Sequence, residues 1–469
     1  MASLIVRVSV VFTGCWQNVV WRVGVSAWLV VGVMAGGVSA APKKTMDRAV
    51  TAAQRGNKPI PIVLRTEPAM RQAVKATLAA HKPKITIEAE FVSISALRVT
   101  LHPKDLAEIL ALPGVLGLSS DAALDGAAAG SWSKKTKTST TTATTTSTTS
   151  TATSAFFADL GESFKQWAVL SGSLGSTWTG LTGKGVGVAV IDSGIDGTLP
   201  EFKDRIAAFY DFTSGGVAVA AQPTDAYGHG THVAGLIGAS SLTFSGLAPK
   251  VHFVGLKVLD GAGRGRTSDV IAALEFVVAN RQALNIQIVN LSLGRPILEP
   301  AASDPLVQAV EHAVAAGIVV VTSAGNHGQN AATGATGYAG ITSPGNAPSA
   351  LTAGSLDLHG TADRSDDTVS PFSSRGPTWY DGLVKPDLLA PGHGLFSSAA
   401  AGSQLAKIST LSAGGQDAKL FGTSMAAATT TGIVALVIEA NRKAFPNAGR
   451  ALPPHAIKAL LQFLSLIHI

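Results

Sequence analysis

The stretch Val188–Asp196 reads Val-Ala-Val-Ile-Asp-Ser-Gly-Ile-Asp and decides the fold. Its first four residues form an uninterrupted apolar run, which is typical of a strand buried on both faces of a parallel sheet. Asp192 follows at the point where this strand ends. In open α/β sheets ligands bind beyond the carboxyl ends of the strands, so Asp192 is a candidate functional residue.

Similar apolar runs recur along the chain and alternate with helical patterns. This alternation predicts an α/β fold with a doubly wound, mainly parallel sheet and helices on both of its faces. The predicted strands are 186–191, 251–259, 286–293 and 318–322, and the predicted helices are 231–237, 269–280 and 306–316, the last closed by Gly317.

A smaller domain precedes this sheet. Between Pro59 and Leu124 the apolar patterns follow the order β-α-β-β-α-β, the split βαβ arrangement of a ferredoxin-like α+β domain. We assign this domain to 43–125. Its predicted strands lie in 60–65, 85–101 (two strands around Ser95-Ala96) and 115–119, and its predicted helices are 68–80 and 104–112.

A tract rich in serine and threonine separates the two domains. Of the 24 residues in 131–154, 18 are Ser or Thr, and none after Trp132 carries a large apolar side chain. Such a tract cannot bury enough apolar surface to offset its ordering entropy, so we expect a solvated linker over 126–156. The second domain then covers 157–469.

Composition narrows the classes of function. With 36 Lys and Arg against 30 Asp and Glu the net charge is only +6, and no dense basic block is present, which argues against a nucleic-acid partner. The chain has one cysteine, Cys15, in the apolar N-terminal stretch. A processed form would therefore have no disulfide, no cysteine-based zinc site and no cysteine nucleophile.

The N-terminus has the pattern of an export signal. An uncharged apolar stretch follows Arg22 and ends in Val38-Ser39-Ala40, the small-x-small pattern that precedes a cleavage site. We therefore predict a signal peptide over 1–40, membrane contact only during export, and a secreted protein. One alternative is an uncleaved anchor over 23–41 that leaves the protein facing outside. Another, a lipidation site at 12–15, would leave the more apolar segment uncut.

Three polar residues carry the candidate chemistry. Asp192 ends its strand, His229 lies in Gly-His-Gly-Thr-His-Val-Ala-Gly, and Ser424 opens a helix in Gly-Thr-Ser-Met-Ala-Ala. A serine hydroxyl becomes a nucleophile when a neutral imidazole accepts its proton, and a carboxylate fixes the tautomer of that imidazole. The order Asp, His, Ser differs from that of α/β-hydrolases, and Ala426 departs from their Gly-x-Ser-x-Gly motif.

From residue 157 to about 462 the chain resembles the subtilisin family of serine proteases, the subtilases. All three motifs above match. Further matches are Thr322-Ser323-Ala324-Gly325-Asn326, Ser373-Ser374-Arg375-Gly376-Pro377 and Lys385-Pro386-Asp387-Leu388-Leu389-Ala390-Pro391-Gly392. The resemblance implies a secreted endopeptidase that acts on proteins or peptides through Asp192, His229 and Ser424, with Asn326 in the oxyanion hole.

The resemblance also implies where a substrate binds. Gly263-Arg264-Gly265 and Ser292-Leu293-Gly294 resemble the strands that flank an extended peptide in the family. Arg264, Arg266 and Arg295 occur where smaller residues are common, so we hypothesise a preference for acidic side chains near the cleaved bond. The 43–125 domain resembles the family's propeptide, which makes it a partner of the catalytic domain in a self-processing, otherwise monomeric zymogen.

Each motif has a simpler explanation. Asp192 or Ser424 could only cap a turn or helix, and Asn326 beside Gly325 could only turn the chain. His232 or Asp196 could replace a catalytic partner, although we expect His232 to pack or hydrogen-bond.

Two other classes of function stay open. One is an inactive subtilase-like binding module. The other is a nucleotide-binding fold built on the glycine run 261–265, although Arg266 replaces the third glycine of that fingerprint.

Departures from the family pattern give three more expectations. The loop between Gly235 and Gly246 is short, so we predict no calcium there, while structural calcium elsewhere stays open; no other metal or cofactor is expected. After Ala427, Ala-Thr-Thr-Thr-Gly replaces the usual Pro-His-Val-Ala-Gly. The segments expected after the helix that begins at Pro454 are missing, and 465–469 matches nothing, which suggests an incomplete C-terminus with a foreign tail.

Overall fold

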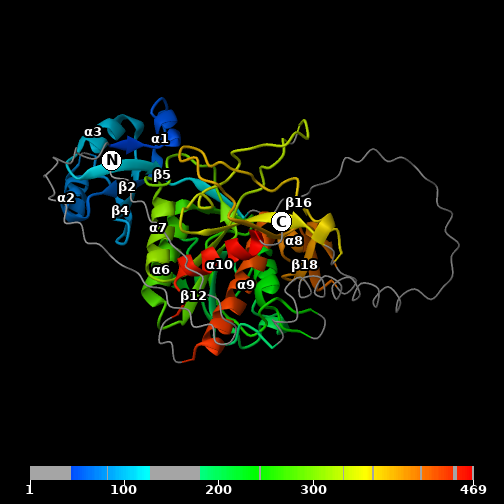
Figure 1. Ribbon diagram of the computed structural model, residues 1–469. Helices are drawn as coiled ribbons and strands as arrows, with labels where there is room; N and C mark the ends of the chain where they lie inside the picture. The colour runs from blue at the N-terminus through cyan, green and yellow to red at the C-terminus, as the bar shows by residue number, and fades with distance from the viewer. Residues whose placement is uncertain are drawn as a thin grey trace, which may run out of the picture. The chain divides into compact units, whose positions relative to one another are not determined.

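The computed structural model describes residues 44–81, 83–126, 180–241, 244–330, 332–361, 364–411, 415–446 and 451–466, all within one compact unit (Figure 1). The predicted signal peptide, Cys15, the linker beyond residue 126 and the predicted start of the second domain at 157 lie outside these residues. So do 467–469, the end of the predicted foreign tail.

The N-terminal domain is built around one antiparallel sheet. Its strand order is β1-β5-β2-β4-β3, with β1 added in parallel to β5. The order β2-α2-β3-β4-α3-β5 is the β-α-β-β-α-β order predicted from the sequence. The elements are β1 (Thr45–Met46), α1 (Arg48–Ala53), β2 (Ile60–Thr66), η1 (Pro68–Met70), α2 (Arg71–Ala80), β3 (Ile87–Phe91), β4 (Ala96–Leu101), η2 (Pro103–Asp105), α3 (Leu106–Ala111) and β5 (Val115–Ser120).

The larger domain contains the predicted doubly wound sheet, which confirms the fold class. Seven strands run parallel in the order β17-β15-β14-β12-β7-β10-β8, and the short strands β16 and β9 are antiparallel. The sheet strands are β7 (Gly187–Asp192), β8 (Ile206–Asp211), β9 (Val219–Ala220), β10 (His252–Lys257), β12 (Ile286–Leu291), β14 (Val319–Ser323), β15 (Leu351–Asp357), β16 (Thr368–Val369) and β17 (Leu388–Pro391).

Helices and short elements complete this domain. A second small sheet has the order β18-β20-β19. The elements are η4 (Pro200–Phe202), α5 (His229–Gly238), β11 (Arg264–Arg266), α6 (Thr267–Asn280), β13 (Leu293–Gly294), α7 (Pro305–Ala315), η5 (Arg364–Asp366), β18 (Leu395–Ser398), α8 (Gln404–Ile408), β19 (Thr410–Leu411), β20 (Asp417–Leu420), α9 (Thr423–Ala444) and α10 (Pro454–Leu466).

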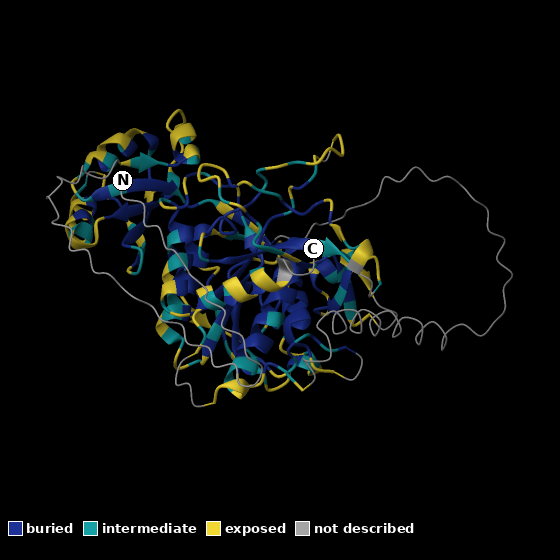
Figure 2. Ribbon diagram, in the orientation of Figure 1, coloured by how far each residue is buried: buried dark blue, intermediate teal, exposed yellow. Residues whose placement is uncertain are grey.

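Two hydrophobic clusters cover the two faces of the sheet, and Figure 2 shows the strands buried between the helices. Along β7, Val188 and Val190 join the cluster of α5 and α9, whereas Ala189 and Ile191 join that of α6 and α7. This alternation explains why the run is apolar at every position. Among the described residues α9 is the helix long and apolar enough to cross a membrane, but 89% of that window is buried inside the protein.

The sheet has a topological switch point at β7. This strand lies between β10 and β12, and the chain continues from it to one side of the sheet before it crosses to the other. The connections that follow the neighbouring strands β7 and β12 therefore leave their carboxyl ends in opposite directions, which opens a crevice between them. Asp192 is the last residue of β7 and therefore lies at this edge of the sheet.

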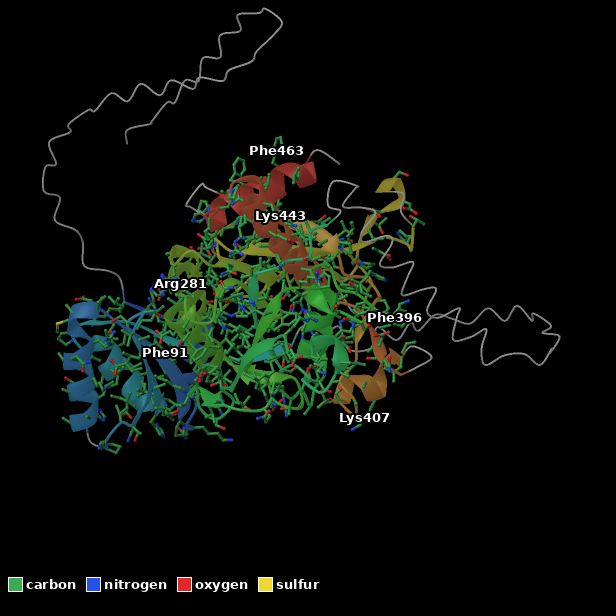
Figure 3. All side chains as sticks on the ribbon, turned by 90° about the horizontal axis from the view of Figure 1, so that it is seen from below. Phe91, Arg281, Phe396, Lys407, Lys443 and Phe463 are labelled. Atoms are coloured by element: carbon green, nitrogen blue, oxygen red, sulfur yellow. The ribbon has the colours of Figure 1, made fainter. Side chains whose placement is uncertain are left out.

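The N-terminal domain docks on the start of α6. The Asp121 carboxylate accepts hydrogen bonds from the Ser268 backbone N–H at 2.8 Å and from its hydroxyl at 2.9 Å. The flanking residue Arg266 gives α6 no side-chain cap, so Asp121 satisfies a helix N–H from the other domain. Phe91, labelled in Figure 3, belongs to the cluster that contains α6, so the two domains share apolar packing as well.

Candidate active site

The carboxylate that ends β7 binds the imidazole that begins α5. Asp192 Oδ1 lies 2.8 Å from His229 Nδ1, and both side chains are fully buried. Oδ1 also accepts a hydrogen bond from the Ser193 backbone N–H at 2.7 Å. These contacts favour the tautomer with the proton on Nδ1, which leaves a lone pair on Nε2 of His229.

A rigid turn positions the imidazole. Gly228 precedes His229 with φ +99°, a conformation that L side chains rarely adopt, and a Cβ there would lie 2.4 Å from Ser403 Oγ. Asp225 accepts hydrogen bonds from the backbone N–H groups of Gly228 (2.7 Å) and Thr231 (2.9 Å), so it caps α5. Asp225 was not among the residues predicted from the sequence.

The pKa of His229 reflects two opposing effects. Burial disfavours the imidazolium and lowers the pKa, but the charge of Asp192 and its hydrogen bond outweigh burial, so the net shift is upward. His229 is therefore a stronger base than an equally buried histidine without a carboxylate. Its Nε2 has no hydrogen-bond partner among the described residues.

Ser424 lies in the first turn of α9, next to the carboxyl end of β12. Its Oγ donates to the carbonyl oxygen of Ser292 at 3.2 Å, and the Ser292 hydroxyl donates to the Ser424 carbonyl oxygen at 3.1 Å. The hydroxyl thus points to Ser292 and makes no hydrogen bond to His229. Catalytic hydrogen bonds are often absent or long in unliganded sites and form when substrate binds.

Asn326 is fixed against the same helix. Its side-chain oxygen accepts hydrogen bonds from the Thr423 backbone N–H at 2.9 Å and from the Thr423 hydroxyl at 3.1 Å. These bonds set the carboxamide orientation, so the NH₂ group forms the donor end of the side chain beside the start of α9. Together with the Ser424 backbone N–H it supplies the kind of donor pair that stabilises an oxyanion.

The two predicted peptide-binding segments flank an extended strand of the same chain. This strand, β6 (Ala123–Gly126), follows the N-terminal domain and pairs antiparallel with β11 and β13 in a three-stranded sheet. Leu124 lies opposite Gly265 and Gly126 lies opposite Leu293, and the Gly126 N–H donates to the Gly263 carbonyl oxygen at 2.9 Å. The predicted linker start at 126 is therefore one residue early, since Gly126 belongs to the strand.

The register of β6 aligns a bound peptide with Ser424. Leu293 pairs with Gly126 and Gly294 with Asp125. In the same antiparallel register, the next residue of a bound substrate lies opposite Ser292, whose carbonyl oxygen contacts Ser424 Oγ. The register thus places the residue after Gly126 next to the Ser424 side chain.

Two polar residues near the site have structural roles. His232 is fully buried, and its Nε2 lies 3.1 Å and 2.9 Å from the carbonyl oxygens of Leu395 and Ala418. Burial lowers its pKa to about 3, so it is neutral. Asp196 accepts hydrogen bonds from the backbone and hydroxyl of Thr198 within its own turn. His232 thus packs and hydrogen-bonds, as the sequence predicts.

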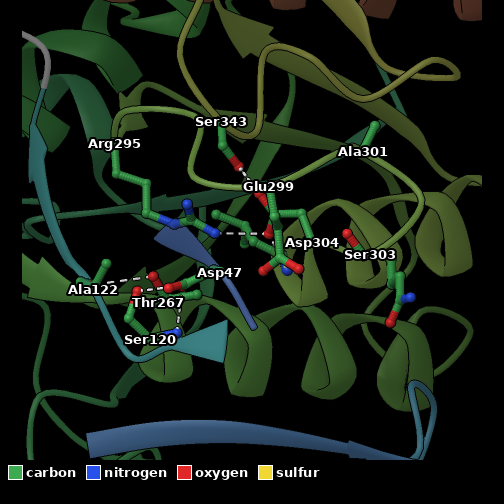
Figure 4. Close-up of polar contacts among 12 residues, drawn as sticks. Asp47, Ser120, Ala122, Thr267, Arg295, Glu299, Ala301, Ser303, Asp304 and Ser343 are labelled. Carbon is green, nitrogen blue, oxygen red and sulfur yellow. Dashed lines mark hydrogen bonds and ion pairs between the residues drawn. The ribbon is translucent and has the colours of Figure 1, made fainter. Parts of the chain in front are cut away.

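Arg295 does not lie free at the cleft, which contradicts the sequence hypothesis for this residue. Its guanidinium is buried and pairs with Asp304 at 2.7 Å, as Figure 4 shows. Asp304 also accepts a hydrogen bond from Ser343 and caps α7. Arg295 therefore holds the loop between β13 and α7, whereas the Arg264 side chain is 70% exposed beside β6.

A buried acidic residue, Glu299, lies where the two domains meet and was not predicted from the sequence. Glu299 is almost inaccessible, and Arg65 of β2 provides its ion-pair partner at 3.7 Å. Neither carboxyl oxygen of Glu299 accepts a hydrogen bond from the described residues. Burial is the main cause that raises its pKa to about 8, and the nearby charge of Asp304 adds to it.

Within the described ranges, no group of three or more His, Cys, Asp or Glu side chains could hold a metal ion. The glycine run 261–265 forms a turn in which Asp260 accepts hydrogen bonds from the Ala262 and Arg264 N–H groups, followed by the edge of β11. Its backbone thus binds a carboxylate and a peptide strand.

Comparisons with known proteins agree on one family. The model of the subtilase family matches residues 183–463, more than half of the chain. Serine protease AprX of Bacillus subtilis is 40% identical over 282 residues, which are 58% of this chain and 61% of the relative. Subtilisin E of Bacillus subtilis is 33% identical over 265 residues, 55% of this chain and 57% of the relative.

The chain spans about 60% of the length of these curated relatives. Among solved structures, fervidolysin from Fervidobacterium pennivorans superposes with a TM-score of 0.62 at 21% identity, over 89% of this chain and 58% of that one. At that identity the likeness concerns the fold. Since the family model covers all three motifs and the structure has the same architecture, the chain belongs to the subtilase family.

Proposed function

We propose that this protein is a serine endopeptidase made as a self-inhibited zymogen, with Ser424 as nucleophile, His229 as general base and Asp192 as its orienting carboxylate. The observation that carries the proposal is the strand β6, which occupies a peptide-shaped site between β11 and β13 in register with Ser424. A binding groove for extended peptides next to a serine hydroxyl and an imidazole that is paired with a carboxylate suits peptide hydrolysis.

The proposed reaction proceeds by acyl transfer. The Ser424 hydroxyl turns from the Ser292 carbonyl, its Oγ bonds to the peptide carbonyl carbon, and His229 Nε2 accepts its proton. The peptide C–N bond then breaks as Nε2 returns the proton to the leaving amine, which leaves an ester on Ser424. Water attacks this ester by the same route and releases the acid. Asp192 holds the imidazole in place and stabilises the imidazolium.

The oxyanion forms beside two donors. The proposed pair is the Asn326 NH₂ group and the Ser424 backbone N–H, and the start of α9 adds its favourable dipole. Thr423 holds the Asn326 side chain through two hydrogen bonds, so this donor is oriented before the substrate arrives. A donor already in place costs no reorganisation during the reaction.

We propose that the N-terminal domain is the propeptide and inhibitor of this enzyme. The strand β6 fills the groove, and two contacts tie the domain to α6. Asp121 accepts a hydrogen bond from the Ser268 N–H in the first turn of α6, and Glu275 further along the helix accepts hydrogen bonds from the Ser93 N–H (2.8 Å) and hydroxyl (2.6 Å). The substrates are then proteins or peptides. A monomeric enzyme exported through the 1–40 signal completes the proposal. No cofactor is part of it, and no calcium is proposed at the short loop between Gly235 and Gly246.

One experiment separates this function from its rivals. The full chain and its Ser424→Ala variant are expressed, and casein hydrolysis and self-cleavage are followed by mass analysis. We expect hydrolysis and loss of the N-terminal domain only in the chain that keeps Ser424. If neither the full chain nor the Ser424→Ala variant cleaves itself or casein, the result would support the inactive binding module. Thermal stabilisation by nucleotides would support the nucleotide-binding alternative.

A further inference from the structure

The strand β6 shows which side chains of a bound peptide face the protein. Leu124 and Gly126 are buried, whereas Ala123 and Asp125 are exposed, as expected for a strand with alternate residues on opposite faces. Side chains at the Leu124 and Gly126 positions are therefore in contact with the groove. The Gly126 position is the nearer of the two to Ser424, because it lies opposite Leu293, next to Ser292.

Little space exists at the Gly126 position. A Cβ added to Gly126 would lie 3.1 Å from Leu259 Cδ1, 3.4 Å from Tyr227 Cε1 and 3.7 Å from the Gly263 carbonyl oxygen. Leu259 Cδ1 is the end of a flexible side chain and can shift by a few tenths of an ångström. One methyl group thus fits after a small adjustment, but longer side chains meet the Tyr227 ring.

The Tyr227 ring has little freedom to move away. It lies so close to Gly263 that a Cβ there would be 2.4 Å from the ring, and its centroid is 6.2 Å from that of His229. Its backbone carbonyl accepts a hydrogen bond from the Leu405 N–H at 3.0 Å. The next residue, Gly228, is held by Asp225. The ring is partly buried, and because it already contacts the backbone at Gly263, its displacement costs more than the shift of one terminal methyl group.

We propose that Tyr227 is a specificity-determining residue that restricts the substrate side chain at the Gly126 position to glycine or alanine. This position is one residue before the residue whose carbonyl group belongs to the cleaved bond. This rests on the proposed peptide-cleaving function. Because the clash arises with the ring and not with the hydroxyl, phenylalanine at position 227 should impose the same limit. Overpacking of this kind lowers kcat/KM for a leucine at that position about 10- to 100-fold relative to glycine.

The test uses ten-residue quenched fluorescent peptides with the sequence of residues 121–130, Asp-Ala-Ala-Leu-Asp-Gly-Ala-Ala-Ala-Gly, in which the glycine is kept or replaced by alanine or leucine. The full chain after self-processing cleaves them, and mass spectrometry identifies the bond. We expect cleavage after the alanine that follows the varied position, with glycine and alanine similar and leucine about 10- to 100-fold slower.

Variants assign the selectivity to the ring. We expect Tyr227→Ala to raise the leucine-to-glycine ratio of kcat/KM about tenfold or more, and Tyr227→Phe to leave it unchanged. Tyr338→Ala is the matched control, since Tyr338 is 71% exposed, and it should keep the ratio of the unaltered chain. Equal rates for all three peptides in the unaltered chain, or the same ratio in Tyr227→Ala, would overturn the inference while the peptidase function stands. Cleavage of none of the peptides would overturn both.

Discussion

Glu299→Gln should remove a large part of the pH dependence of stability. The pKa of Glu299 is raised from 4.5 to about 8 by burial, by Asp304 and by Asp47, against the opposing charge of Arg65. The folded chain therefore binds this proton more tightly than the unfolded chain. Its contribution to stability is complete below pH 4.5 and is lost as the pH rises towards 8.

The size of this effect follows from the two pKa values. At pH 5 the carboxyl of the unfolded chain is already largely ionised, whereas Glu299 in the folded chain stays neutral until the pH approaches 8. Between pH 5 and pH 8 the folded chain therefore loses stability over an interval equivalent to about 2.6 pH units. At 1.36 kcal/mol per unit this amounts to about 3–4 kcal/mol. Glutamine has nearly the same shape and does not titrate, so the variant avoids this loss.

Urea unfolding followed by circular dichroism measures the difference. All chains carry Ser424→Ala to prevent self-cleavage, and the free energy of unfolding is compared at pH 5 and pH 8. We expect the chain with Glu299 to lose about 3–4 kcal/mol more than the Glu299→Gln chain over this interval. Glu67→Gln, at an exposed position of the N-terminal domain, is the control. Equal losses with and without Glu299 would refute the reasoning.

Three further predictions concern the groove. Asn326→Ala should lower kcat about 100- to 1000-fold on a peptide substrate with little change in KM, because one oxyanion donor is lost; unchanged turnover would exclude this role. Leu124→Ala should weaken the hold of β6 by about 2–5 kcal/mol, since Leu124 is fully buried, and speed hydrogen exchange of the Gly126 amide in the Ser424→Ala chain; unaltered exchange would count against it. Arg264→Ala should reduce the preference for acidic over neutral substrate residues at the Asp125 position about 2- to 5-fold at low salt, because Arg264 lies opposite Asp125. A cleavage profile that depends neither on the charge at this position nor on salt would contradict the hypothesis.

The strands buried on both faces were readable from the sequence because their apolar runs are continuous. β7, β10, β12 and β14 have that signal. β8, β15 and β17 were not predicted: β8 has intermediate burial over much of its length, and β15 ends in polar residues. Their position depends on pairing with distant strands, which local periodicity does not contain.

The first and last strands of the N-terminal domain could not be predicted from local periodicity either. The β-α-β-β-α-β core has full strands and regular helices, so its order followed from apolar spacing. β1 has two residues and β6 has four, and both form only by pairing with partners far along the chain. The sequence therefore did not predict that β6 pairs with the segments 263–265 and 292–294, although these two segments were predicted from the resemblance to the family.

At the site, motifs identified residues but not their surroundings. Asp192, His229, Asn326 and Ser424 came from short contiguous patterns, and the structure brings them to one edge of the sheet. The role of Arg295 was misjudged because its partner Asp304 lies nine residues away, across a loop. Tyr227 stood next to a recognised motif, but its contact with Gly263 requires two separate loops to meet.

Covalent labelling of the nucleophile tests the central claim most directly. The processed chain is treated with an organophosphonate, which reacts with serines activated by a neighbouring imidazole, and the modified peptide is mapped by mass spectrometry. We expect one label, on Ser424, and its attachment blocks hydrolysis of the 121–130 peptide. A processed chain that cleaves peptides while Ser424 stays unlabelled, or that carries the label on another serine, would contradict the account.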